Sequence, residues 1–150
     1  MKTKKKPKKP TLQQITEKAR KKAVILAKKI AVLMDKETCQ HCGKRKIDGW
    51  QMHGSHIYPE GVYKSMSSDI DNILCLCAQC HTGGFWKNAT KPSWHEDPCY
   101  FVFWFERKYP ERSQILRERS QKPKSCDLIF WQDKYQDLKD TYKKLSAPTR

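Results

Sequence analysis

Apolar residues recur at steps of three and four positions from Leu12 to Leu33, which is the period of an amphipathic α-helix. Thr11 and Gln14 have the spacing of a capping box at the start of this pattern. The sequence therefore predicts a basic amphipathic helix over residues 11–36. Its packing face is expected to comprise Leu12, Ile15, Ala19, Ala23, Leu26, Ile30 and Leu33, with Lys18, Lys21, Lys22, Lys28 and Lys29 in solvent.

Two short segments in the middle of the chain are expected to form β-strands. They are residues 50–58, "WQMHGSHIY", and residues 73–77, "ILCLC", with a polar loop over residues 59–72 between them. Cys80 and His81 are expected to begin a helical turn, which Gly83 and Gly84 keep short.

The C-terminal third predicts helices. Asp97 and Pro98 are an N-cap and a first helical residue, and the run Cys99–Phe105 is apolar all round, which predicts a substantially buried helix. Pro110 starts a second helix, and Pro123 separates it from a last one. An apolar stripe in the last helix predicts core packing or a surface for a protein partner or self-association, with a surface for base stacking as the alternative. The stripe consists of Leu128, Trp131, Tyr135, Leu138, Tyr142 and Leu145.

Positive charge is concentrated at the N-terminal end. The net charge is +15, and residues 1–36 hold 13 of the 31 lysines and arginines. Residues 1–10 contain six lysines and nothing to bury, which predicts a disordered basic arm. Such an end suits a polyanion, DNA or RNA before an anionic membrane, unless it serves only solubility. The lysines expected to bind nucleic acid are Lys4, Lys5, Lys6, Lys8, Lys9, Lys18, Lys21 and Lys22.

No segment has the length of a membrane span. The apolar run Ala23–Ala27 is too short for a signal-peptide core, and Lys28 and Lys29 interrupt its continuation. We therefore expect a protein of the cytoplasm that does not bind membranes.

Four of the seven cysteines form two Cys-x-x-Cys pairs, Cys39 with Cys42 and Cys77 with Cys80. Two such pairs have the ligand number and spacing of a closed, tetrahedral structural Zn²⁺ site. Cys75 shares a strand face with Cys77 and is an alternative ligand, but it has no Cys-x-x-Cys partner of its own. Cys99 and Cys126 are expected to act as small hydrophobic residues.

Histidines lie between and beside these pairs. Hydrolysis of a phosphodiester at neutral pH needs a base that activates water and a cation that stabilises charge on the phosphorus, and imidazole suits the first task. His53, His56 and His81 are the candidates within the module. His41 is expected to face solvent, and His95 to be a structural or capping residue. Trp86 and Trp94, which flank Lys87 and Lys91, are expected to pack in the core or else to stack on nucleic acid.

The segments "CQHCG", "GSHIYPEG" and "DNILCLCAQCH" together resemble the HNH endonucleases, also called ββα-metal or His-Me finger nucleases, of the zinc-ribbon type. The resemblance covers about residues 39–85. Within this family, "WQMHGSHIYPEG" and "FERKYPER" look most like phage NinG/Rap-type recombination nucleases, which implies DNA, branched DNA included, as substrate and the host cytoplasm as location.

The resemblance implies a role for each matching residue. His56 would be the general base, Asn72 would fix the loop and the orientation of the histidine, and His81 would bind Mg²⁺ or another catalytic divalent ion. Many HNH enzymes have an aspartate or histidine as metal ligand directly before the base, where this chain has Ser55. His53 or a water molecule held by Ser55 would replace that ligand.

The prediction is thus an α+β fold in which a zinc-stapled ββα-metal module is flanked by helices. Its parts are an arm at 1–10, a basic helix at 11–36, the nuclease module at 37–95 and a helical region at 96–150. The expected function is metal-dependent hydrolysis of DNA phosphodiester bonds. Two alternatives are a non-catalytic zinc ribbon that binds nucleic acid and an assembly factor that docks a partner on the C-terminal stripe. The zinc ribbon does not require the set His56, Asn72 and His81.

Overall fold

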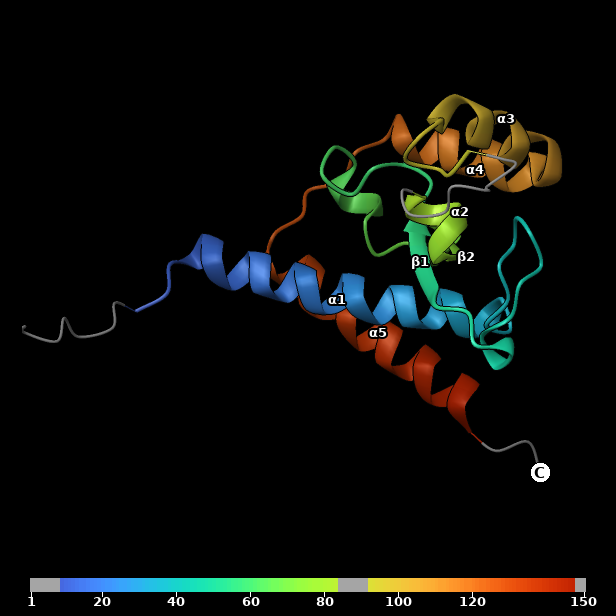
Figure 1. Ribbon diagram of the computed structural model, residues 1–150. Coiled ribbons are helices and arrows are strands. Elements are labelled where there is room, and N and C mark those ends of the chain that lie inside the picture. Colours follow the sequence, from blue (N-terminus) through green and yellow to red (C-terminus); the bar gives the residue numbers. More distant parts are fainter. Residues whose placement is uncertain (1–8, 84–91, 148–150) are drawn as a thin grey trace, which may run out of the picture.

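The computed structural model describes residues 9–83 and 92–147 of the chain. It is an α+β structure in which a two-stranded antiparallel sheet lies between two pairs of helices (Figure 1). Helices α1 and α5 pack side by side below the sheet, and α3 and α4 lie above it with the short helix α2. The predicted fold class is therefore confirmed.

Helix α1 (Leu12–Met34) begins where the sequence predicts. The Thr11 hydroxyl accepts a hydrogen bond from the Gln14 backbone N–H, and the Gln14 side chain accepts one from the Thr11 N–H, which completes the capping box. The predicted packing face is wrong in part, because Leu12, Ile15 and Leu33 are exposed. The buried residues of α1 are Ala23, Val24, Ala27, Ile30 and Ala31. The small alanines let the neighbouring sheet and helix approach closely, so they set the buried face.

The sheet pairs β1 (Met52–His56) with β2 (Ile73–Cys77), in the register Met52 to Cys77 and His56 to Ile73. All five residues of β2 are buried, so both of its faces are covered by helices. The loop between the strands contains the 3₁₀ turns η2 (Lys64–Met66) and η3 (Ile70–Asn72), and another turn, η1 (Lys46–Asp48), precedes β1. Both predicted strands are confirmed.

Helix α2 (Ala78–Thr82) follows β2 directly and carries Cys80 and His81, as predicted. Beyond it, α3 (Pro98–Lys108) begins with Asp97 as N-cap, and α4 (Pro110–Ser120) begins at Pro110. The expectation that the run Cys99–Phe105 is buried all round is wrong. Phe101 and Phe105 are buried, whereas Cys99 and Phe103 face solvent because α3 covers the sheet with one side only.

Helix α5 (Leu128–Ser146) packs its stripe against α1. Trp131 and Leu138 are buried in one cluster with the α1 residues Ala23, Ala27 and Ile30, and Tyr135 and Tyr142 pack against that cluster. Core packing is therefore the role of the stripe within this chain, and Leu145 at its end is exposed.

No helix in the described parts of the chain combines the length and apolar character that a bilayer crossing needs. Some of the predicted features fall on residues 1–8 and 84–91, which lie outside the described residues. They concern the basic arm up to Lys8, and Gly84, Trp86, Lys87 and Lys91. Trp94 is half-buried and packs on Phe101, with ring centroids 4.9 Å apart, so it belongs to the core.

Candidate metal centre and catalytic site

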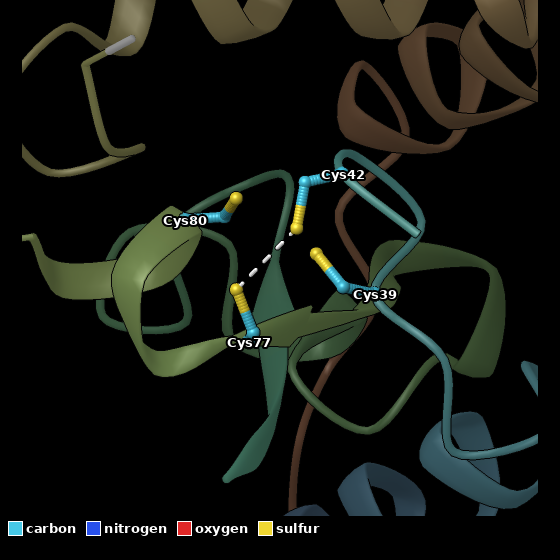
Figure 2. A group of neighbouring side chains, drawn as sticks. All are labelled: Cys39, Cys42, Cys77 and Cys80. Atoms are coloured by element: carbon cyan, nitrogen blue, oxygen red, sulfur yellow. Dashed lines mark hydrogen bonds between the residues drawn. The ribbon is translucent and has the colours of Figure 1, made fainter. Parts of the chain in front are cut away.

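The two Cys-x-x-Cys pairs meet above the sheet. Cys39 and Cys42 lie in the turn after α1, Cys77 ends β2, and Cys80 lies in α2, with their sulfur atoms turned toward one another (Figure 2). The backbone N–H of Gln40 donates to the Cys75 carbonyl at 2.9 Å, which holds the first pair beside β2. The four Sγ atoms lie within 4.8 Å of one another.

The geometry of this cluster fits a zinc ion. Four sulfur atoms about 2.3 Å from a tetrahedral zinc ion lie about 3.8 Å apart, and the Sγ atoms of Cys42 and Cys77 are 3.7 Å apart. Hydrogen bonds from the Cys77 and Cys80 thiols hold the pKa of Cys39 far below its usual range, so the cluster already favours a thiolate. All seven cysteines are free thiols, and the cluster of four has the ligand set of a closed structural metal site, which has no open position for catalysis.

Cys75 is outside this cluster. Burial, followed by the negative charge of Asp35, raises the pKa of Cys75 to about 12, so it remains a neutral thiol. The alternative in which Cys75 replaces a ligand is therefore not favoured.

His41 does not face solvent, contrary to the sequence prediction. Its Nδ1 lies 3.3 Å from Cys80 Sγ and its Nε2 lies 3.2 Å from the Tyr100 hydroxyl. Its ring also packs on Phe101, with centroids 4.6 Å apart. The residue connects the cysteine cluster to α3, which arrives from about sixty positions away in the sequence and so escapes local pattern analysis.

His56 lies at the end of β1 and is largely buried. Its Nε2 lies 2.7 Å from the backbone carbonyl oxygen of Ser67, which can only accept a hydrogen bond. Nε2 therefore carries the proton of the neutral ring, and Nδ1 carries the lone pair. Burial lowers the pKa of His56 from its ordinary value, so the ring is neutral at neutral pH.

Asn72 is fully buried and joins the end of β1 to the loop that carries Ser67. Its Oδ1 accepts from the Tyr58 N–H at 2.7 Å, and its Nδ2 donates to the carbonyls of Tyr58 and Met66 at 3.0 and 3.1 Å. Its own carbonyl accepts from the Ile57 N–H at 2.9 Å. This arrangement suits the predicted role of Asn72, which is to fix the loop and the orientation of His56.

His53 and His81 meet between β1 and α2. Their Nδ1 atoms lie 3.0 Å apart. That separation suits two adjacent positions of an octahedral ion with ligand distances of about 2.1 Å. Burial, followed by the charges of His95 and His53, lowers the pKa of His81 to about 4, so its ring is neutral, as a metal ligand must be. Ser55 is buried, so a water molecule held by its side chain is the less favoured replacement ligand.

His95 lies beside His81. Its ring centroid lies 4.8 Å from that of His81, and its backbone N–H donates to the backbone carbonyl of His81 at 3.2 Å. These contacts agree with the structural role expected for His95, but the two residues are fourteen positions apart, so no periodic spacing indicated the contact.

The lysines predicted to bind nucleic acid divide into two groups. Lys9 and the α1 residues Lys18, Lys21 and Lys22 are exposed, whereas the others lie outside the described residues. Lys28 was expected in solvent as well, but it is half-buried beside β1, with its Nζ 3.4 Å from Glu60 Oε2.

Residues 39–83 match the model of the HNH endonuclease family. The match contains both cysteine pairs, His53, His56, Asn72 and His81, and it excludes α1, α3, α4, α5 and His95. No curated protein and no solved structure matches the chain. The predicted HNH resemblance is thus supported for the central module.

Proposed function

We propose that this protein is a metal-dependent endonuclease that hydrolyses DNA phosphodiester bonds. The observation that carries the proposal is the hydrogen bond from His56 Nε2 to the Ser67 carbonyl, inside a region that matches the HNH model. It leaves Nδ1 as a proton acceptor on a neutral, largely buried ring, which is what a general base requires.

In the reaction, the oxygen of a water molecule forms a bond to phosphorus while its proton passes to His56 Nδ1. The bond between phosphorus and the 3′ oxygen then breaks, and that oxygen leaves with the electron pair and takes a proton from solvent. The products have 5′ phosphate and 3′ hydroxyl ends.

A divalent ion such as Mg²⁺ supplies positive charge to the phosphate and the departing oxygen when it is bound. His81 and His53 are the residues proposed to hold this ion, because their Nδ1 atoms lie 3.0 Å apart. The cysteine cluster is proposed to hold structural zinc, since four thiolates complete the coordination of a tetrahedral ion.

The exposed lysines of α1 and the N-terminal arm are proposed to bind the DNA backbone. The net charge of +15 favours a polyanionic partner, and phosphate contacts supply most of the non-specific affinity of such proteins. The similarity to NinG/Rap-type nucleases makes a four-way junction the first branched substrate to compare with linear duplex.

The decisive experiment is a cleavage assay with wild-type protein and His56→Ala on linear and branched DNA, with and without Mg²⁺. We expect Mg²⁺-dependent cleavage by wild type and a decrease of about 10²–10⁴-fold in rate for the variant. Zinc content and DNA affinity should be unchanged in His56→Ala. DNA binding by wild type without cleavage would favour the non-catalytic zinc ribbon instead.

A further inference from the structure

Helix α1 lies outside the matched HNH region, yet it approaches the strand that carries His56 more closely than any side chain at Gly54 would permit. A Cβ atom at Gly54 would lie 2.8 Å from Lys28 Cβ and 2.9 Å from Lys28 Cα. Real Cβ atoms do not come this close to a neighbouring backbone atom, so the absence of a side chain at Gly54 is what admits Lys28. The lysine is thereby fixed over the strand, beside a residue two positions before the proposed base.

The ammonium group of Lys28 and the base nitrogen of His56 flank the same carboxylate oxygen. Glu60 Oε2 lies 3.4 Å from Lys28 Nζ and 3.4 Å from His56 Nδ1. This oxygen is buried and has no hydrogen-bond partner among the described residues. Both separations are longer than a hydrogen bond, so Glu60 holds Lys28 near the base by charge attraction and not by a hydrogen bond.

A second cation, Arg20, also lies near His56. The charges of Lys28 and Arg20 both act on His56, and Arg20 Nη1 is a second buried polar atom with no hydrogen-bond partner in the described chain. The other two nitrogens of Arg20 are bound to Glu17 at 2.9 and 2.8 Å. Arg20 is thus paired closely with Glu17, whereas the contact of Lys28 with Glu60 is longer, at 3.4 Å, so Lys28 is the better placed of the two cations to bind an anion.

Lys28 is also accessible to a ligand. It lines an open groove of about 480 Å³ together with Lys29, Gly54 and the ion pair of Lys46 with Glu37, and its side chain retains 38% of its exposure. Because Lys28 Nζ and His56 Nδ1 each lie 3.4 Å from Glu60 Oε2, a phosphate in contact with water at Nδ1 would be within reach of the ammonium group. The pentacoordinate phosphate carries more negative charge than the diester, so a fixed cation at this position stabilises the transition state more than the ground state.

We propose that Lys28 is a catalytic residue that binds a non-bridging oxygen of the scissile phosphate, and that Glu60 holds its ammonium group beside His56 until DNA binds. This proposal rests on the proposed nuclease function. It adds to the HNH module a residue from a helix that the family match does not include.

The test compares Lys28→Gln with Lys143→Gln in the full chain, because the two variants remove the same charge and Lys143 is an exposed residue of α5 with no role in the proposed site. Single-turnover cleavage at saturating DNA and Mg²⁺ separates rate from affinity. We expect the rate of Lys28→Gln to fall by about 10²-fold or more, and that of Lys143→Gln to stay close to wild type.

Lys28→Arg keeps the positive charge and should therefore recover most of the rate. A lysine with a merely structural role would not depend on the charge in this way. Zinc content and circular dichroism show whether each variant folds. If Lys28→Gln does not fold, the test depends on Lys28→Arg. A folded Lys28→Arg variant that cleaves as slowly as His56→Ala overturns the proposal. Equal rates for Lys28→Gln and Lys143→Gln, with His56→Ala inactive, would also overturn it while leaving the nuclease function intact. Absence of any cleavage by wild type would contradict both the proposed nuclease function and the proposed role of Lys28.

Discussion

His56 Nε2 lies 2.7 Å from the carbonyl oxygen of Ser67, a residue that is fully buried eleven positions further along the chain. The carbonyl fixes both the tautomer and the orientation of the imidazole, because it accepts the ring proton at one nitrogen and leaves the lone pair on the other. The buried Asn72 holds the same loop through the carbonyl of Met66, directly before Ser67. The position of the proposed base is thus set by backbone atoms that no side-chain substitution at Ser67 would remove.

The pH dependence of cleavage should report the neutral form of His56. Burial, Lys28 and Arg20 lower the pKa of His56, whereas the Ser67 carbonyl and Glu60 raise it, and the net shift is downward. The base form therefore persists below the ordinary imidazole pKa of about 6.5. Single-turnover rates at saturating Mg²⁺ should stay constant as pH falls through that value and decline only in more acidic solution.

Removal of Glu60 should shift the decline of the cleavage rate in acidic solution to a still lower pH. Glu60→Gln eliminates a negative charge that stabilises the imidazolium, so the pKa of His56 should fall and the decline should move to lower pH. Glu111→Gln, which changes an exposed carboxylate in α4, is the matched control and should leave the profile unchanged. A shift to higher pH in Glu60→Gln would contradict the assignment of His56 as the titrating base.

The cysteine cluster should hold one zinc ion per chain. Cys39→Ser removes a buried ligand, so zinc should dissociate and the central region should unfold at much lower denaturant concentration, because binding of structural zinc contributes directly to folding. Cys126→Ser changes a thiol outside the cluster and should retain zinc and stability. Elemental analysis and urea titration measure the two effects. Folded wild-type protein without zinc would contradict the assignment.

His81→Ala and His53→Ala should weaken binding of the catalytic divalent ion and leave the zinc site intact. Each removes one nitrogen of a pair 3.0 Å apart, so cleavage should require a higher Mg²⁺ or Mn²⁺ concentration and recover partly when it is supplied. Cleavage rates as a function of metal concentration provide the measurement. His41→Ala, which alters a histidine beside the cysteine cluster, is the control whose Mg²⁺ dependence should not change. An unchanged metal requirement in His53→Ala would mean that His53 does not replace the metal ligand that many HNH enzymes have at the position of Ser55.

Features set by local spacing could be predicted from the sequence. The pairs Cys39 with Cys42 and Cys77 with Cys80 follow from ligand geometry, and the starts of α1 and α3 follow from caps at Thr11 and Asp97. Each of these features depends on residues within four positions of one another, so the local sequence is enough to predict it.

Contacts between distant segments could not be predicted in this way. His95 contacts His81 although the two are fourteen positions apart, and Lys28 reaches β1 because α1 packs through small alanines and against Gly54. The amphipathic pattern located α1 correctly but misjudged its buried face, since hydrophobic periodicity does not include the shape of the partner surface. As a consequence, one lysine expected in solvent lies beside the proposed base.

Gly54→Ala should destabilise the protein and impair cleavage together. The new methyl group would overlap with Lys28 Cα and Cβ, so α1 must move away from β1, at a cost of about 1–3 kcal/mol in the free energy of unfolding. Gly61→Ala is the control, because nothing lies within 4 Å of a Cβ atom at that position. Urea denaturation of both variants measures the difference. Equal stability would mean that the packing of α1 on β1 relaxes without cost.

The N-terminal arm should determine much of the salt dependence of DNA binding. Residues 1–10 carry six lysines, and each of them that neutralises a phosphate releases counterions from the duplex. Deletion of the arm should reduce the slope of log affinity against log salt by roughly 0.9 for every phosphate that is no longer neutralised. The cleavage rate at saturating DNA should stay unchanged, because the proposed base and metal ligands lie in the central module.

Replacement of the six lysines by glutamine at constant length is the matched control, and it should reproduce the effect of the deletion if charge alone is responsible. An unchanged slope in both variants would restrict the arm to a role in solubility and assign the electrostatic binding of DNA to the exposed lysines of α1.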